Sequence, residues 1–442
     1  MIGADSLSQT ARAEKGTEPR VLDLFAGAGG LAEGFRQAGS VIAAGTDVDP
    51  DACATFCLNF PEAETVCGDI RSPNVRERVL DAARGTDIVV GGPPCQAFSQ
   101  VRNHSRLIDD PRNSLYREFV AVVGAVRPRA FVMENVPGLQ QMGVKEQVIA
   151  DLSLDGDYCV GAQVLDAANF GVPQTRRRIV FIGLDRSLGQ QPPEVEGSGA
   201  TESAFLSRLN GRELARYCIQ PQGNDGAALL ERLADPEDLT AVNAEQAIGD
   251  FSVLRSGTSD DEISVSNLRQ PSSAYQRLMR RGASACVLNS SVPRMNADTA
   301  IRLKEIPEGG NYRDLPDELL NRYLTGARWG PDAGNGRLSR RHYYAYRRLH
   351  SGFWCWTLNT KADSVYHYSE PRALCVREFA RIQSFPDRFI FTTDSRKGLL
   401  PGRIDGGPGH SRYRQVGNAV PPLLALAVAK AVLRSVTDGQ LT

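Results

Sequence analysis

The sequence lacks several features that would place it in other classes of protein. Its nine cysteines include no Cys-x-x-Cys pair, and the nearest cluster, Cys53, Cys57 and Cys67, does not have the spacing of a zinc site. The polar N-terminus has no apolar signal core, and no run of about 18 apolar residues occurs. We therefore expect a cytoplasmic protein with reduced thiols, no bound metal and no membrane span.

The chain also lacks a strong overall charge. Its formal net charge is −1 over 442 residues, so a polyanionic partner would need a locally basic face. Residues 222–262 hold ten acidic and two basic residues, whereas 269–350 hold fifteen basic and seven acidic residues. The basic part ends in a segment in which arginine and tyrosine interleave. Its candidate contacts to a nucleic-acid backbone are Arg340, Arg341, Arg347 and Arg348, and a solvated basic face is the alternative.

A strand, a glycine-rich turn and a helix begin the ordered part of the chain. Residues 20–25 predict a short apolar strand, 26–30 read Ala-Gly-Ala-Gly-Gly, and 31–36 predict a helix. This order is typical of the first unit of a nucleotide-binding sheet, although such glycines also occur for packing alone. Residues 1–18 show no periodicity and predict a loose arm.

Acidic residues follow the next two predicted strands. Asp47 comes directly after the strand 41–46 and suits a ribose diol, whereas Asp49 resembles the N-cap of the following helix. Asp69 ends the next strand, where a carboxylate could accept a hydrogen bond from an exocyclic amine such as that of adenine. Helix capping is an equal alternative for each of these aspartates.

A cysteine stands at the end of a buried strand in the segment 91–99, Gly-Gly-Pro-Pro-Cys-Gln-Ala-Phe-Ser. The two prolines stiffen this turn, and open α/β sheets bind ligands at the carboxyl ends of their strands. Cys95 is therefore a candidate nucleophile, with an inert buried thiol as the alternative. Glu134 ends the next predicted strand, so a parallel sheet would place it beside Cys95. The polar segment 99–113 predicts a mobile lid or a solvated connection.

The later segments predict a hairpin, a linker and two helices. Residues 157–184 predict a β-hairpin in which Arg176 and Arg178 share one face. Residues 189–203 predict a linker, 371–386 contain an amphipathic helix, and an apolar helix at 423–432 closes the chain.

Six blocks of sequence, in this order, resemble the DNA cytosine-5 methyltransferase family in its bacterial modification-enzyme form. They are residues 23–30, 91–99, 134–136, 174–178, 377–386 and 414–422. The resemblance implies an α/β fold with a doubly wound, mostly parallel sheet and a smaller, irregular domain that recognises the DNA target. The implied divisions are an arm at 1–18, a catalytic domain at 19–186, a target-recognition domain at 187–370, a hinge at 371–412 and a returning C-terminal segment at 413–442.

The same resemblance implies a reaction. A methyl group would pass from S-adenosylmethionine to carbon 5 of a cytosine flipped out of duplex DNA, with S-adenosylhomocysteine as the second product. Cys95 would attack carbon 6, and Glu134 would hold or protonate ring nitrogen 3. Arg178 and Arg176 would bind the base carbonyl. The expected cofactor-pocket residues are Phe25, Ala26, Gly27, Gly29, Gly30, Asp47, Val48, Asp69, Ile70, Pro93, Leu115, Asn418 and Ala419. The expected DNA contacts from the lid segment are Ser99, Gln100 and Arg102.

Two other functions stay open at this point. One is an RNA cytosine-5 methyltransferase, although the family's transfer-RNA branch tends to carry threonine where this chain has Ser99, and its recognition region is short. The other is an inactive DNA-binding paralogue, against which the intact Cys95 and Glu134 argue. For the leading reading we expect a monomer that binds double-stranded DNA, paired in function with a restriction endonuclease or another phage-defence protein.

Overall fold

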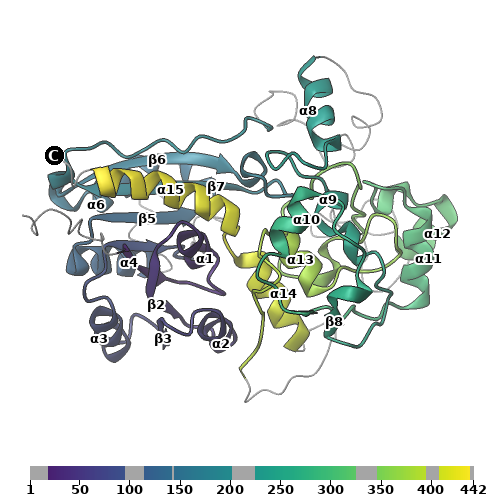
Figure 1. Cartoon of the computed structure of the whole chain (residues 1–442), viewed down its shortest axis with the longest axis horizontal. Helices are drawn as coiled ribbons and strands as arrows, with labels where there is room; N and C mark the ends of the chain where they lie inside the picture. Colours follow the sequence, from purple (N-terminus) through teal and green to yellow (C-terminus); the bar gives the residue numbers. More distant parts are fainter. Residues whose placement is uncertain are drawn as a thin grey trace, which may run out of the picture.

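The computed structural model describes residues 18–94, 114–141, 144–201, 224–324, 346–394 and 408–438. Six residues with roles predicted from the sequence lie outside these ranges: Cys95, Ser99, Gln100, Arg102, Arg340 and Arg341. The described residues form two lobes (Figure 1). We call residues 18–201 together with the C-terminal helix α15 (Pro422–Asp438) the sheet lobe. Residues 224–394 together with the preceding helix α14 (Pro408–Asn418) form the second lobe.

A seven-stranded sheet with the strand order β3-β2-β1-β4-β5-β7-β6 forms the centre of the sheet lobe. In that order the strands are Glu64–Cys67, Val41–Asp47, Arg20–Leu24, Ile88–Gly91, Ala130–Asn135, Arg177–Asp185 and Tyr158–Asp166. Neighbours among β1 to β5 pair in parallel, and β7 runs antiparallel to both β5 and β6. The doubly wound, mostly parallel sheet and the hairpin at 157–184 are therefore confirmed.

Helices cover both faces of this sheet. They are α1 (Gly30–Gln37), α2 (Pro50–Asn59), α3 (Pro73–Ala82), α4 (Ser114–Val126), α5 (Gly138–Gln141), α6 (Lys145–Leu152) and α15 (Pro422–Asp438). Alternate residues of a central strand enter opposite cores: Ile88 and Val90 of β4 pack with residues of α1 and α15, whereas Val89 packs with residues of α3, α4 and α6. Burial on both faces explains why these strands are continuous apolar runs in the sequence.

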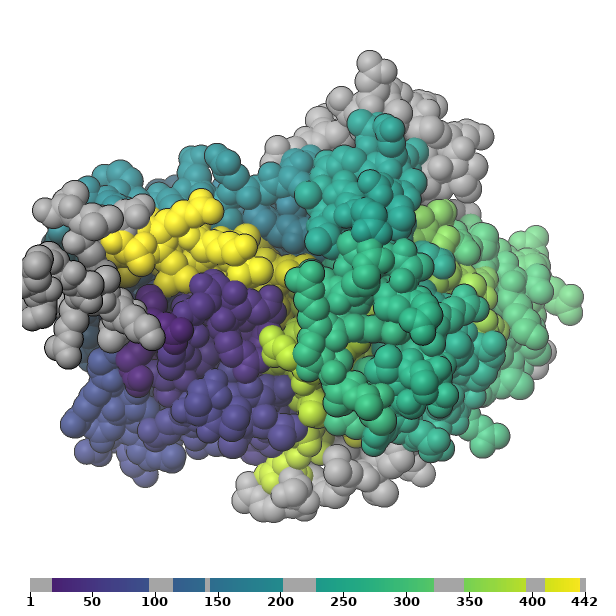
Figure 2. All heavy atoms as spheres, in the orientation of Figure 1, coloured from purple at the N-terminus to yellow at the C-terminus, as the bar shows by residue number. Residues whose placement is uncertain are grey.

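The C-terminal helix returns to the sheet lobe and packs closely on α1 (Figure 2). A β-carbon added at Gly34 would lie 2.3 Å from the β-carbon of Ala425, and one added at Gly30 would lie 2.2 Å from the carbonyl oxygen of Val420. By its length and composition, the helical stretch His410–Thr437 could cross a membrane. However, 56% of its most apolar segment of 18 residues is buried inside the protein. This burial is that of a core helix.

The second lobe is built from short elements joined by irregular segments. Its named elements are α8 (Asn224–Ala234), α9 (Ala244–Ile248), β8 (Glu262–Ser264), α10 (Ala274–Met279), β9 (Cys286–Leu288), α11 (Ala297–Glu305), α12 (Asp317–Leu324), α13 (Val376–Ile382) and α14 (Pro408–Asn418). Many of its buried apolar side chains, among them those of α9, α10 and α13, belong to one cluster with residues of the sheet lobe, and others form smaller clusters of their own. The strands β8 and β9 form a two-stranded sheet. A smaller, irregular second domain is therefore confirmed.

The helix α13 differs from the amphipathic helix predicted within 371–386. All of its residues are buried, including its charged ones. Arg381 donates from Nε to Asp387 Oδ1 at 2.7 Å and from Nη1 to Asp250 Oδ1 at 3.2 Å. A buried charge is tolerated when it is paired and hydrogen-bonded, so the polar face that the sequence suggests is satisfied by protein instead of water.

The contact between α1 and α15 can be tested with one methyl group. Gly34→Ala is expected to lower the free energy of unfolding by about 1–3 kcal/mol, because the added carbon overlaps the backbone of Ala425. Gly124→Ala in α4 is the matched control, since its added carbon would meet Leu154 at an ordinary 3.8 Å. Urea unfolding of both variants measures the difference. If Gly34→Ala and Gly124→Ala had the same free energy of unfolding, the close packing of α1 on α15 would be contradicted.

Candidate active site

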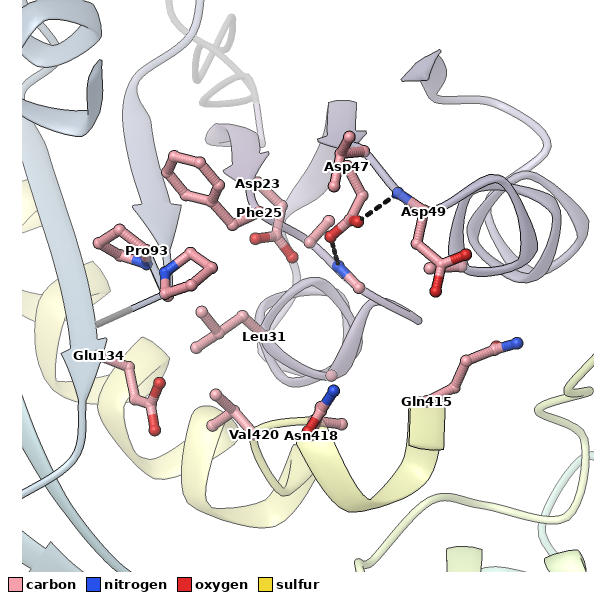
Figure 3. Close-up of a pocket in the computed structure, with 18 of the residues that line it drawn as sticks. Asp23, Phe25, Leu31, Asp47, Asp49, Pro93, Glu134, Gln415, Asn418 and Val420 are labelled. Atoms are coloured by element: carbon pink, nitrogen blue, oxygen red, sulfur yellow. Dashed lines mark hydrogen bonds between the residues drawn. The ribbon is translucent and has the colours of Figure 1, made fainter. Parts of the chain in front are cut away.

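A cavity of about 640 Å³ opens at the carboxyl ends of β1, β2, β4 and β5, where the two lobes meet. Figure 3 shows Pro93 and Glu134 at one end of it and Asp47 and Asp49 at the other. The predicted site residues that line it are Phe25, Ala26, Gly27, Gly30, Asp47, Val48, Asp69, Ile70, Pro93, Leu115, Glu134, Arg176, Arg178, Asn418 and Ala419. These fifteen residues come from distant parts of the sequence and all line a single cavity.

The glycine-rich turn between β1 and α1 is held by Asp47. The backbone NH of Gly27, a residue with a φ of 54°, donates to Asp47 Oδ2 at 2.8 Å. The other carboxylate oxygen of Asp47 accepts from the backbone NH of Asp49 at 2.9 Å (Figure 3). Burial disfavours the charged form and raises the pKa of Asp47. Asp47, the residue predicted to bind a ribose, therefore also fixes the turn.

Gly29, predicted to line the cofactor pocket, is not among the residues that line the cavity. It is the N-cap of α1 with a φ of 97°, and a β-carbon there would lie 2.5 Å from the ring of Phe60. Backbone conformation and packing account for this glycine, as the alternative reading of the turn allowed.

The other two strand-end aspartates have separate tasks. Asp49 accepts from the backbone NH of Asp51 at 3.1 Å and caps α2, which confirms its predicted role. Asp69 lines the cavity, but Arg71 donates to it from Nη2 at 2.6 Å and from Nε at 2.9 Å. These bonds lower the pKa of Asp69. An amine that reached Asp69 would share an ionised carboxylate with Arg71.

Glu134 and Arg178 form an ion pair at the other end of the cavity. The Nε of Arg178 lies 2.6 Å from Oε1 of Glu134, and both side chains are largely buried. A β-carbon on Gly92 would lie 3.0 Å from Oε2 of Glu134, so the glycine lets the carboxylate lie against this turn. The side-chain amide of Asn135 donates to the carbonyl of Pro93 at 3.0 Å and fixes the turn to β5. The sequence suggested no role for Asn135, although its place beside Glu134 at a strand end was a usable signal.

Arg176 lines the cavity, but its guanidinium is bound by backbone carbonyls. It donates to Gly417 at 2.9 Å and to Leu358 and Asn418 at 3.4 Å each. It precedes the first residue of β7, and burial lowers its pKa to about 9. The contact between Arg176 and a base carbonyl therefore stays a prediction, whereas the bonds of its guanidinium to the second lobe are present.

Several cavity residues were not predicted. Most of those in the second lobe are polar. They include Thr357, Leu358, Asn359, Thr360, Arg414 and Gln415. Arg414 donates to Asp49 Oδ2 at 2.6 Å and so connects α14 to the start of α2. Asp23 also lines the cavity from within β1. Its acidic side chain inside an apolar strand was the available signal.

The two described arginines of the basic segment have different surroundings. Arg347 places its guanidinium carbon 5.2 Å from the ring centre of Trp356, the residue before the cavity-lining Thr357. Arg348 donates to the backbone carbonyls of Ile306 at 2.5 Å and of Leu303 at 3.0 Å. Because these bonds use its guanidinium inside the lobe, we leave Arg348 out of the DNA contacts that we propose.

Comparison with known proteins agrees with this geometry. Residues 19–434 match the family of C-5 cytosine-specific DNA methylases, and the chain belongs to this family. It is a DNA cytosine-5 methyltransferase by fold and by sequence.

The relatives and a solved structure share nearly the whole length of the chain. Type II methyltransferase M1.HphI of Haemophilus parahaemolyticus is 30% identical over 94% of this chain and 87% of its own. Type II methyltransferase M.DdeI of Desulfomicrobium norvegicum is 32% identical over 93% and 88%. A prophage-encoded Escherichia coli protein, described as a DNA modification methyltransferase, has the same fold, with a TM-score of 0.64, 21% identity and coverage of 95% of this chain and 100% of its own.

Asp23 is expected to make the free energy of unfolding of the protein depend on pH. The side chain is fully buried, its Oδ2 accepts from the backbone NH of Ala32 at 3.1 Å, and its Oδ1 has no partner among the described residues. Burial raises its pKa from 3.8 to about 8. Because the folded-state pKa is raised, the stability that Asp23 contributes is complete below pH 3.8 and is lost as the pH rises toward 8.

Asp23→Asn removes this titration and keeps the shape. The free energy of unfolding of the wild type should therefore fall more steeply between pH 5 and 8 than that of the variant, by up to about 1.4 kcal/mol per pH unit. Denaturant unfolding at four pH values measures both slopes. Parallel slopes would show that Asp23 is ionised throughout.

Proposed function

We propose that this protein methylates carbon 5 of a flipped-out cytosine within a specific sequence of duplex DNA, as the modification enzyme of a restriction-modification or other phage-defence system. One observation carries the chemistry: the Glu134–Arg178 ion pair lines the same cavity as Pro93 and Pro94, and Cys95 follows Pro94 directly in the sequence. The Type II relatives support the modification role.

The cavity has the chemistry to hold S-adenosylmethionine. Val48 is 65% exposed although it is a large aliphatic residue, and it lines the cavity next to Asp47. An exposed apolar surface beside a carboxylate suits a nucleoside, whose base needs an apolar wall and whose ribose needs an acceptor. Phe25, Ile70 and Leu115 would extend that wall. When bound, S-adenosylmethionine would supply the electrophilic methyl group that carbon 5 takes up.

The residues at the other end of the cavity suit cytosine. Addition of the Cys95 thiolate to carbon 6 would form a carbon–sulfur bond and move an electron pair toward carbon 5, which is otherwise a weak nucleophile. Transfer of the proton from carbon 5 to water after methylation would restore the ring double bond, break the carbon–sulfur bond and free the Cys95 thiolate. Glu134 in its protonated form would give a proton to ring nitrogen 3 as charge moves into the ring, and Arg178 would bind the ring carbonyl.

The ion pair itself prepares the site for the base. Without a base, Arg178 and Glu134 neutralise each other in a largely buried position. A cytosine inserted between them would offer its carbonyl as an acceptor to Arg178 and its exocyclic amine as a donor to Glu134, so both charged groups would stay hydrogen-bonded. Flipping the base out of the helix costs about a few kcal/mol, and these exchanged hydrogen bonds would offset part of that cost.

DNA would be held from the second lobe and from the lid segment. Arg347 stacks on Trp356 beside the cavity, and a guanidinium there would be well placed for a phosphate. We assign the remaining contacts to Ser99, Gln100, Arg102, Arg340 and Arg341 on the basis of the sequence. We also propose the division into a catalytic domain at 19–186 and a target-recognition domain at 187–370, with the enzyme acting as a cytoplasmic monomer.

Covalent trapping tests the proposed mechanism. Duplex DNA that contains 5-fluorocytosine should form an adduct with the protein in the presence of S-adenosylmethionine, because fluorine at carbon 5 cannot leave as a proton does. The adduct is detected as a band of reduced mobility on a denaturing gel. Cys95→Ala should give no adduct and no methyl transfer while it still binds DNA. Glu134→Gln should slow methyl transfer by about 10²–10⁴-fold.

Two results would overturn this proposal. Substantial methyl transfer by Cys95→Ala would remove the nucleophile, and an adduct formed with transfer RNA but not with duplex DNA would indicate an RNA substrate. The wild type with unmodified DNA serves as the control for non-covalent retention.

A further inference from the structure

A buried pair of glutamines connects the two lobes beneath the cavity. Gln174, which precedes β7, and Gln383, which follows α13, are both 0% exposed. Oε1 of Gln174 accepts from the backbone NH of Leu358 at 2.9 Å, and its Nε2 donates to Oε1 of Gln383. Nε2 of Gln383 in turn donates to the carbonyl of Ala419 at 2.6 Å. Leu358 and Ala419 both line the cavity.

The four groups form one directed chain of hydrogen bonds. Each amide accepts on one side and donates on the other, from the NH of Leu358 to the carbonyl of Ala419. Turning either side-chain amide over would put two donors or two acceptors face to face, and a buried group left without a partner costs about 1–3 kcal/mol. The positions of the two peptides are therefore linked, and neither glutamine can adjust alone.

The two linked peptides belong to parts of the site with different tasks. Leu358 lies in the segment by which the second lobe returns to the sheet, where Cys355 pairs with Gln174 as a parallel β-bridge and donates to Pro173 at 2.9 Å. Ala419 lines the cavity directly after Asn418, which lies across the cavity from Asp47 (Figure 3). The hydrogen bonds thus connect the second lobe at Leu358 to the wall of the proposed cofactor pocket at Ala419.

Arg176 reinforces the same connection on its other side. It donates to the carbonyl of Leu358, whose NH is bound by Gln174, so the backbone of Leu358 is held on both sides. It also donates to Gly417 at 2.9 Å, two residues before Ala419. Apolar side chains of similar volume could fill the space that Gln174 and Gln383 occupy. A satisfied amide pair adds direction, which apolar packing does not provide.

We propose that Gln174 and Gln383 are positioning residues that couple the binding of DNA by the second lobe to the binding of the cofactor in the cavity. This inference rests on the proposed function, because it takes the cavity to be the S-adenosylmethionine site. Coupling of this kind is reciprocal: DNA bound at the second lobe raises the affinity for the cofactor by the same factor by which the cofactor raises the affinity for DNA.

The coupling factor can be measured on the full chain by titration calorimetry. The probe is S-adenosylhomocysteine, titrated with and without a duplex that the wild type methylates, and the ratio of the two dissociation constants is the coupling factor. For the wild type we expect a factor of about 5–150. Gln383→Met removes both bonds of the second glutamine and should reduce the factor to within about twofold of 1.

Two further variants separate positioning from general stability. Gln383→Glu keeps the acceptor for Gln174 but cannot donate to Ala419, so it should lose the coupling as well. Gln276→Met in α10 is the matched control: Gln276 is also 0% exposed, accepts from Ser272 and donates to Glu245, away from the cavity. It should lower the melting temperature and leave the coupling factor unchanged.

The outcomes separate this inference from the proposed function. A wild type that binds neither S-adenosylhomocysteine nor DNA would overturn the proposed function and this inference with it. A wild type that binds both with a coupling factor near 1, or glutamine variants that keep the wild-type factor, would overturn this inference alone. Should Gln383→Met fail to fold, Gln174→Glu replaces it, because it keeps the acceptor for Leu358 and loses the donations to Gln383 and to the carbonyl of Ile382.

Discussion

The close packing of the C-terminal helix on α1 is the contact that completes the site. Glycines at 30 and 34 let α15 and the residues before it approach the first helix, and the carbonyl of Val420 occupies the space where a β-carbon on Gly30 would lie. Asn418 is thereby placed across the cavity from Asp47 (Figure 3), and Ala419 follows it in the cavity wall. A wall that comes from residues near position 420 thus closes a pocket whose floor comes from residues 20–50.

Buried polar groups carry the connection from this contact to the second lobe. Arg381 in α13 is bound by Asp387 and Asp250, and Gln383, just after the helix, reaches the carbonyl of Ala419. Such groups contribute little net stability compared with apolar packing, since their desolvation offsets most of their attraction. Their effect is geometric: a small set of bonds fixes where the second lobe stands against the cavity.

Much of this arrangement could be predicted from the sequence. The strand ends at Asp47, Pro93 and Glu134 follow from apolar runs that stop at polar or proline residues, and parallel pairing brings such ends together. The helix cap at Asp49 was also predictable, because capping depends on residues close in sequence. Local patterns and the six family blocks therefore specify the sheet lobe and one end of the cavity.

The remaining features depend on contacts between residues far apart in the chain. From the sequence, Arg176 is predicted to bind the carbonyl of a base and Arg348 a nucleic-acid backbone, yet both guanidiniums donate to carbonyls from other segments of this chain. The charged residues of α13 look like a solvent face, and their partners come from the second lobe, more than a hundred residues earlier in the case of Asp250. No local pattern distinguishes an arginine that binds a carbonyl of its own chain from one that binds a phosphate.

Bisulfite sequencing of DNA from cells that express this protein tests the central claim most directly. The account predicts that cytosines resist conversion at one recurrent sequence throughout the genome, and that the same cytosines convert in cells expressing the Cys95→Ala variant. Full conversion everywhere with a folded, expressed wild type, or protection that persists with the variant, would contradict it.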